Sequence, residues 1–195
     1  MKQILRILVL TLFLKFTFTN AQTEVNINGV KLPRTIKFKS REIELNGVGI
    51  RSKLWFDVYT QALYLTKLSQ NAGDILDSNT LMAVRIQITS SLVSSRKFSK
   101  SINNGLQRSV GDERWKTFKP QLDLLEKFIN SEEIVEKDIF NLVYNPEDES
   151  MWIIKNDVVK GQIPGIDFKR AFFGIWLSNN PIDKTLKNDL LGIYE

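Results

Sequence analysis

The 195-residue sequence contains no cysteine and no histidine, and these two absences narrow its chemistry. Without cysteine there is no disulfide, no thiolate nucleophile and no Cys-ligated zinc. Without histidine there is no imidazole base, no Ser-His-Asp triad and no His-ligated metal. Any acid–base chemistry must therefore use Tyr, Lys, Asp or Glu side chains with shifted pKa values. We expect no metal site and no cofactor.

Long apolar runs are also scarce, and the one at the N-terminus has the pattern of an export signal. A positively charged start precedes a short apolar stretch over residues 7–14, and Ala21 ends a cleavage motif. The stretch is shorter than the roughly 20 residues that span a bilayer, and Lys15 interrupts it. We therefore expect residues 1–21 to be a signal peptide cleaved after Ala21. The product, residues 22–195, would be one exported, periplasmic domain with no integral membrane segment.

Strong charge of one sign is absent once that segment is set aside. The whole chain carries a formal net charge of +5, whereas residues 22–195 contain 24 basic and 22 acidic residues, a net charge of +2. This balance is too even for a nucleic-acid surface, and export argues against one as well. The remaining length suits a single domain with a substantial core.

Alternating apolar patterns predict short strands joined by hairpins. The sequence VNINGVKLP, near residue 25, places an Asn-Gly turn between two short strands. In the segment 81–88 the even-numbered residues are apolar, so that face should meet the core. A tight turn is predicted at Ser52-Lys53. The predicted strands are 36–38, 43–45, 54–65, 81–88, 139–144, 151–155 and 158–163.

Helical periods occupy the middle and the end of the chain. Apolar residues recur every four positions from Phe98 to Val110, with Ser94 or Ser95 as N-cap and Gly111 as C-cap. Pro120 marks the first turn of a fresh helix.

Near the end of the chain, Asp167 is expected to cap one helix. Asn180-Pro181 is expected to begin another, which Gly192 ends. Strands joined by hairpins, with the helices grouped apart from them, predict an α+β fold. Its large antiparallel sheet would be covered on one face by helices.

The segment LNGVGIRSKLWFDVYTQALYL, residues 45–65, contains the best candidate site. Gly47 and Gly49 allow a bulge or a close backbone approach. If Arg51 and Tyr59 converge on a cleft, a guanidinium and a phenol form a receptor for a carboxylate or an enolate. The residues alone favour a simpler arrangement, in which Arg51 is an exposed turn charge and the tyrosine hydroxyl is in water.

Two long motifs resemble the chalcone isomerase family, and most of all its exported bacterial chalcone isomerase-like branch. The segment 45–65 is similar to a Gly-x-Gly-x-Arg hairpin followed by a Val-Tyr-x-x-x-Leu-Tyr-Leu strand. The segment DFKRAFFGIWLSNNPIDKTLKNDLLG is similar to the family's closing Trp-Leu-Gly-x-x-Pro helix pair, with Ser178 in place of the usual glycine. The resemblance implies an open-faced β-sandwich with a ligand cleft between sheet and helices.

The resemblance also implies roles for particular residues. In fatty-acid-binding members an arginine and the first tyrosine hold the ligand carboxylate, and these positions match Arg51 and Tyr59. In the plant enzymes the arginine acts with a threonine, a tyrosine, an asparagine and a late hydroxyl. Those positions fall on Tyr59, near Lys97, on Asn104 and on Ile175, so most of the plant-type catalytic set is not matched.

Three functions follow as hypotheses. The first is a non-catalytic periplasmic protein that binds a fatty acid or another apolar carboxylate through Arg51 and Tyr59. The second is an isomerase or intramolecular lyase on a chalcone-like or enone substrate, with Arg51, Tyr59 and Asn104 as its catalytic residues. The third is an envelope interaction module whose cleft is vestigial.

Overall fold

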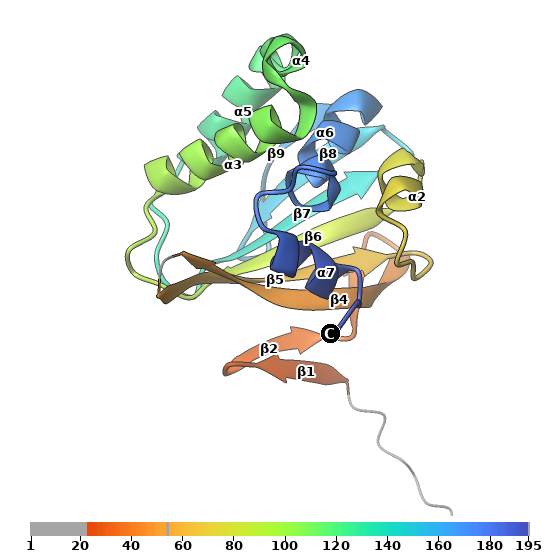
Figure 1. Ribbon diagram of the computed structural model, residues 1–195, viewed down its shortest axis with the longest axis vertical. Helices are drawn as coiled ribbons and strands as arrows, with labels where there is room; N and C mark the ends of the chain where they lie inside the picture. The colour runs from red at the N-terminus through yellow and green to blue at the C-terminus, as the bar shows by residue number, and fades with distance from the viewer. Residues whose placement is uncertain (1–22, 54, 195) are drawn as a thin grey trace, which may run out of the picture.

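The computed structural model of the protein describes residues 23–53 and 55–194, in which seven strands form one antiparallel sheet (Figure 1). The strands follow one another across the sheet in chain order. The predicted signal peptide and its cleavage site lie outside the described residues. The α+β class with a large antiparallel sheet is confirmed. The strands are β3 (Thr35–Phe38), β4 (Arg41–Lys53), β5 (Phe56–Leu65), β6 (Met82–Ile88), β7 (Ile139–Asn145), β8 (Ser150–Lys155) and β9 (Val158–Pro164).

The helices gather over one face of this sheet (Figure 1). None of the described helices is long and apolar enough to cross a bilayer. The helices are α2 (Ala72–Asp77), α3 (Ser95–Val110), α4 (Asp112–Thr117), α5 (Lys119–Ile129), α6 (Ile166–Leu177) and α7 (Lys184–Leu190).

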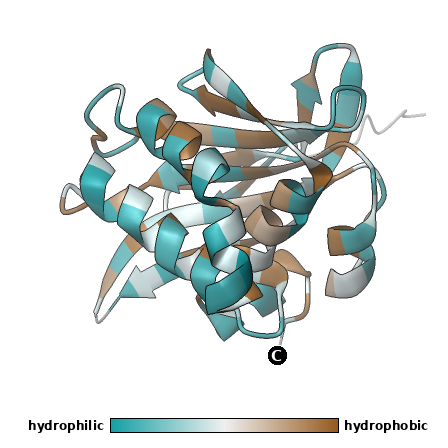
Figure 2. Cartoon of the chain, turned by 90° about the horizontal axis from the view of Figure 1, so that it is seen from above, coloured by the Kyte–Doolittle hydropathy of each residue, from teal (hydrophilic) through white to brown (hydrophobic). Residues whose placement is uncertain are grey.

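The main core lies between the sheet and this helical layer. The even-numbered residues of β6 are buried in it, as the alternation predicts. Phe172 and Trp176 of α6 stack edge-on at the centre, with ring centroids 5.5 Å apart, and both are almost fully buried. Viewed by hydropathy, hydrophilic and hydrophobic segments alternate along the helices (Figure 2). Helices α3 and α5 thus bury one stripe in the core, whereas α6 is buried along most of its length.

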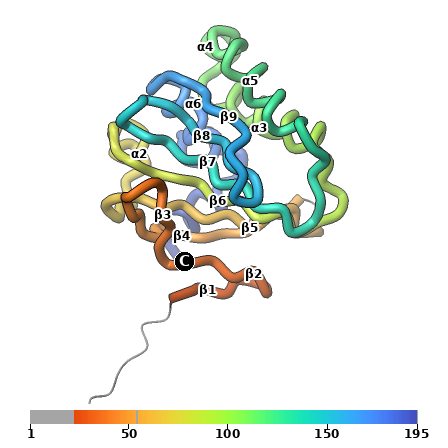
Figure 3. The backbone as a smooth tube through the Cα atoms, turned by 180° about the vertical axis from the view of Figure 1, so that it is seen from behind, coloured from red at the N-terminus to blue at the C-terminus, as the bar shows by residue number. Residues whose placement is uncertain are grey.

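A smaller apolar layer covers part of the opposite face, so the helices are not the sheet's only cover. The predicted N-terminal hairpin forms β1 (Glu24–Ile27) and β2 (Val30–Pro33), which pair with each other apart from the large sheet (Figure 3). Leu32 is fully buried there, and the hydroxyl of Tyr64 donates a hydrogen bond to the carbonyl oxygen of Pro33 at 2.8 Å. The odd-numbered residues Leu81 and Ala83 are apolar because they face this second layer.

Two predicted helix starts are wrong. Helix α6 begins at Ile166 with Gly165 at its N-cap, so Asp167 lies in the first turn. Helix α7 begins at Lys184, where the side chain of Asp183 accepts a hydrogen bond from the backbone N–H of Leu186. The preceding segment cannot be helical because it folds back onto α6. In that segment the backbone N–H of Ile182 donates to the carbonyl oxygen of Ile175 at 2.8 Å.

Candidate functional site

The β4–β5 hairpin supplies the candidate site, and its pairing shifts register twice. The first shift, between Leu45 and Gly47, is the predicted bulge. The second lies beyond the pair of Arg51 and Tyr59 and leaves Val58 opposite no partner in the register. A bulge turns neighbouring side chains toward the same face, and the consecutive residues Val58 and Tyr59 both line one cavity.

The predicted turn at Ser52-Lys53 is wrong. Strand β4 continues through Lys53, which pairs with Phe56 at the hairpin tip. The longer hairpin carries Lys53 and Phe56 to the cavity as well.

The two glycines of β4 make room for helix α7. A Cβ atom at Gly47 would lie 2.2 Å from the carbonyl oxygen of Asp189, and one at Gly49 would lie 2.7 Å from its Cβ. Both distances are too short for any side chain, so the close approach predicted from the glycines is confirmed. What approaches them is the C-terminal helix of the same chain.

Arg51 is tied to the start of that helix. Its Nη1 lies 2.8 Å from Oδ2 of Asp183, and the two side chains are only 22% and 20% exposed. Asp183 is also the N-cap of α7. Arg51 is therefore not the exposed turn charge that the residues alone favoured, and it is not among the described residues that line the cavity. Its role toward a ligand stays a prediction.

Tyr59, opposite Arg51 in the register, is 4% exposed. Its hydroxyl oxygen accepts a hydrogen bond from Nε1 of Trp176 at 3.3 Å. Burial raises the pKa of Tyr59 to about 12, against smaller opposing effects of that hydrogen bond and of Arg51. The phenol is therefore neutral at physiological pH, and its O–H keeps the capacity to donate a hydrogen bond.

We call the space beside Tyr59 the hairpin cavity. It lies between the β4–β5 hairpin and α3 and has a volume of about 660 Å³, within the usual range for small-molecule sites. Its lining contains apolar side chains, four basic residues and no acidic residue. The apolar lining residues are Phe56, Val58, Leu92, Val93, Phe98 and Ile182, and the basic ones are Lys53, Lys97, Lys100 and Arg108.

Of the residues singled out from the sequence, Tyr59 and Asn104 line the hairpin cavity together, with Lys97 beside them. Ile175 is buried in the core at 1% exposure and packs against Gly105, where a Cβ atom would lie 2.7 Å from its Cγ2.

Sequence reasoning missed Lys53, Lys100 and Arg108. A usable signal was present, because residues 95–110 contain four basic side chains and no acidic one.

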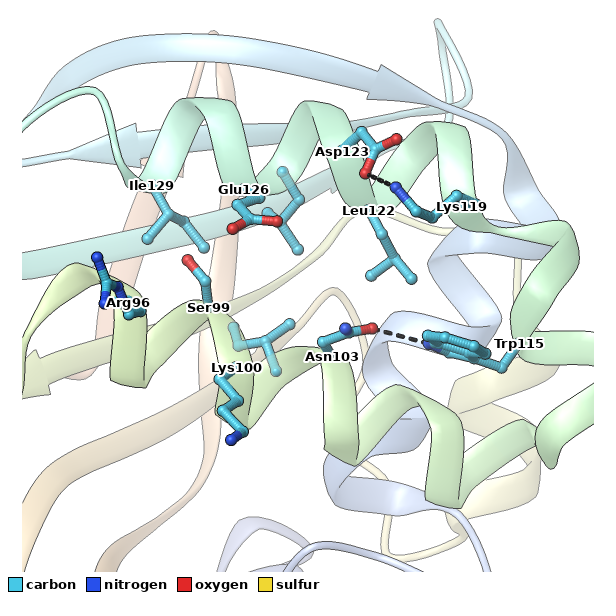
Figure 4. Close-up of a pocket in the computed structure, with 12 residues that line it drawn as sticks. Arg96, Ser99, Lys100, Asn103, Trp115, Lys119, Leu122, Asp123, Glu126 and Ile129 are labelled. Atoms are coloured by element: carbon cyan, nitrogen blue, oxygen red, sulfur yellow. Dashed lines mark hydrogen bonds and ion pairs between the residues drawn. The ribbon is translucent and has the colours of Figure 1, made fainter.

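A second, smaller space lies on the other flank of α3, and we call it the α3–α5 groove (Figure 4). Its volume is about 320 Å³. The Nε1 of Trp115 donates to Oδ1 of Asn103 at 2.7 Å at one end, and Lys119 pairs with Asp123 within it. Lys100 lines both spaces.

The described part of the chain holds no group of three or more carboxylates that could surround an ion, and the sequence has no Cys or His.

An α+β domain with an apolar, cation-lined cavity between sheet and helices is thus defined by fold and site. The family model for chalcone isomerase-like proteins matches residues 24–192, and the chain belongs to this family. Among solved structures, the chain is similar to the fatty-acid binding protein AtFAP1 of Arabidopsis thaliana, with a TM-score of 0.69 and 18% identity. The match covers 86% of this chain and 95% of that one. A search of curated protein sequences finds no match.

Proposed function

We propose that the protein is an exported, periplasmic binding protein for a fatty acid or a similar apolar carboxylate, held without catalysis in the hairpin cavity. The observation that carries the proposal is the composition of that cavity, whose lining combines apolar side chains with four cations and no carboxylate. The family and the fatty-acid binding structural neighbour support the same class of ligand. Cell fractionation and N-terminal sequencing test the location. Export predicts a mature chain that starts at Gln22, and an uncleaved cytoplasmic chain would contradict it.

The apolar part of the cavity suits an acyl tail. Phe56, Val58 and Phe98 supply apolar surface from both walls. Each buried methylene stabilises a complex by about 0.8 kcal/mol, so a medium-length chain gains useful affinity from burial alone. This contribution requires no catalytic group.

The head group would lie near Tyr59 and Arg51. A guanidinium has five N–H donors, so Arg51 retains donors beyond its bond to Asp183. The neutral phenol of Tyr59 adds one donor at the cavity wall. Around them, the exposed lysines attract a carboxylate through space.

Calorimetric titration with decanoate and with its methyl ester tests this proposal, since the two probes differ in charge but share a tail. Wild type should bind decanoate more tightly than the ester. Arg51→Ala should weaken decanoate binding about tenfold or more, because a charge-assisted hydrogen bond contributes roughly 1.5–3 kcal/mol. It should change ester binding little.

Arg170→Ala is the matched control, because Arg170 also makes an ion pair, with Asp77 at 2.9 Å, but lies on α6, whereas Arg51 is opposite the cavity-lining Tyr59 in the register. The control should bind decanoate like wild type. Equal loss in both variants, or no decanoate binding in wild type, would contradict the proposal.

The alternative is an isomerase or intramolecular lyase acting on a chalcone-like or enone substrate. One observation favours it: Tyr59 and Asn104 line the same cavity. Arg51 would stabilise a developing oxyanion and Tyr59 would relay protons. Absorbance assays with chalcones and other conjugated phenolics test it. Turnover that Tyr59→Phe removes would favour the enzyme, and its absence at high protein concentration leaves binding as the better account.

The third hypothesis, an interaction module with a vestigial cleft, predicts a cleft filled by side chains. The hairpin cavity instead has a volume of about 660 Å³. This observation favours a ligand.

A further inference from the structure

The mouth of the hairpin cavity is surrounded by exposed cations and exposed apolar side chains. Lys53, Lys97, Lys100 and Arg108 all line the cavity and are all exposed; we call them the basic rim. Between Lys53 and Phe56, at the hairpin tip, Trp55 is 87% exposed. A tryptophan with so much free surface has no role in the core.

Leu92 lies on the facing side of the same mouth. It lines the cavity and is 56% exposed. Its carbonyl oxygen accepts a hydrogen bond from Nζ of Lys97 at 2.9 Å, which holds the cation beside it. The β4–β5 hairpin tip and the β6–α3 loop lie at the same end of the molecule in both views (Figures 1 and 3). We call the basic rim together with Trp55 and Leu92 the docking surface.

Acidic residues are kept away from the docking surface. The chain has no Asp or Glu from residue 78 to residue 111, a stretch that includes all of α3. On the hairpin, Asp57 pairs with Ser52 in the register, one step from Lys53, and accepts a hydrogen bond from Oγ of Ser52 at 2.7 Å. Because successive strand residues point to opposite faces, Asp57 lies on the far side of the hairpin. Asp183 is neutralised by Arg51.

We propose that the docking surface binds the headgroup region of an anionic phospholipid bilayer and presents the mouth of the hairpin cavity to it. The docking surface combines basic residues with exposed apolar ones, and a bilayer surface suits both. Its phosphates attract lysine and arginine, and its interfacial layer is where tryptophan is enriched. The proposal rests on the proposed function in one respect, since an apolar ligand would enter or leave the cavity at that surface. We expect the protein to bind this membrane surface reversibly.

Flotation of the purified protein with vesicles tests it. The probes are vesicles of phosphatidylcholine alone and of phosphatidylcholine mixed with phosphatidylglycerol. The protein should float with the mixed vesicles, float far less with phosphatidylcholine alone, and be released by added salt, which screens the charges. Equal flotation with both kinds of vesicle would overturn the proposal, and it would do so even if another protein binds the same surface.

Charge-reversal variants locate the contact. Each basic side chain near an anionic surface strengthens binding about fivefold, so Lys53→Glu with Lys97→Glu should weaken flotation at least ~25-fold. The control is Lys31→Glu with Arg34→Glu, which makes the same change in net charge at exposed positions of the β2 region. The control should change flotation less than about threefold. Equal losses in both double variants would overturn the proposal, because net charge alone would then explain binding.

The aromatic contact has its own pair of variants. Trp55→Ser should weaken flotation about tenfold by removing its apolar surface from the interface. Tyr194→Ser removes another exposed aromatic ring, one that is 69% exposed, and should have no effect. Equal effects would overturn the role of Trp55.

The membrane-docking proposal and the proposed ligand-binding function can be disproved independently. Copurified carboxylate without vesicle binding would overturn docking alone, whereas vesicle binding without an apolar ligand would overturn only the proposed function.

Discussion

Helix α3 separates two spaces of different character, the hairpin cavity on one flank and the α3–α5 groove on the other. The hairpin cavity is about twice as large, at about 660 Å³ against 320 Å³. Its charged lining residues are all basic, whereas the groove also contains Asp123 and Glu126. The same helix therefore faces an uncompensated positive lining on one flank and, on the other, a lining in which two acidic residues offset most of the charge of three basic ones.

Lys100 illustrates the difference in charge between the two linings because it belongs to both. Its side chain extends from α3 away from α5 (Figure 4). On the groove side, carboxylates of α5 compensate the local positive charge, and Lys119 already pairs with Asp123. On the cavity side no acidic residue lines the space, so the lining supplies no counterion for its cations. Charge compensation, more than shape, distinguishes the hairpin cavity from the α3–α5 groove.

Filling each space in turn with a tryptophan side chain should give the largest difference in decanoate affinity. Ser101→Trp places a large ring in the hairpin cavity, whose lining includes Ser101. Because the ring excludes about four methylenes at roughly 0.8 kcal/mol each, we expect about a 100-fold loss of decanoate affinity. Calorimetric titration measures it. Lys119→Trp places the same ring in the α3–α5 groove and should leave the affinity within about twofold, since no tail is bound there. A larger loss of affinity in Lys119→Trp than in Ser101→Trp would assign the ligand to the groove.

Alkaline pH should distinguish the two spaces through Tyr59. Its pKa is raised from 10.0 to about 12 in the folded protein. The folded state therefore keeps this proton where the unfolded chain loses it. The stabilising contribution is complete below pH 10 and is lost as pH rises through 12.

Wild type should lose about 2–3 kcal/mol more stability than Tyr59→Phe across that interval. Urea unfolding at successive pH values measures the difference. Tyr64 and Tyr144, whose pKa values burial also raises, contribute equally in both proteins. Trp115→Phe, in the groove, should follow the wild-type pH curve. Identical curves for wild type and Tyr59→Phe would mean that the phenol is not buried as described.

Neutralising charged residues that line the two spaces should have the smallest effect on decanoate affinity. Lys97→Gln with Arg108→Gln removes two exposed cations from the hairpin cavity and should weaken decanoate binding about tenfold, since exposed pairs contribute up to about 1 kcal/mol each. Binding of the methyl ester should not change. Removal of the groove's acidic charges by Asp123→Asn with Glu126→Gln should leave both affinities within about twofold. A loss shared by the acid and the ester would show that the cations act by packing.

Local pattern predicted most of the fold. Alternation and aromatic or β-branched content located the strands, Gly111 caps α3 as predicted, and of the two predicted N-caps, Ser94 and Ser95, it is Ser94 that caps this helix. Helix α2 was not predicted, since six residues with a single buried position, Ile75, show no period. The start of α7 was wrong because a tertiary contact between Ile182 and Ile175 holds the preceding segment outside a helix. The start of α6 was wrong because its N-cap is Gly165, whose backbone N–H donates to the carbonyl oxygen of Glu149.

The candidate site was less predictable because its contacts join distant parts of the chain. The sequence indicated Arg51, Tyr59 and the close approach at the glycines of β4. It could not indicate that α7 fills that approach or that Asp183, 132 positions away, pairs with Arg51. Trp176 lies in the core. Its hydrogen bond to the tyrosine hydroxyl depends on how α6 lies across the sheet.

The most direct test is mass spectrometry of the small molecules extracted from protein purified from its own host. We predict an apolar carboxylic acid, near one per protein in wild type and absent from Ser101→Trp, with Lys119→Trp as the loaded control. An extract without any apolar acid, or the same acid in equal amount from all three proteins, would contradict it.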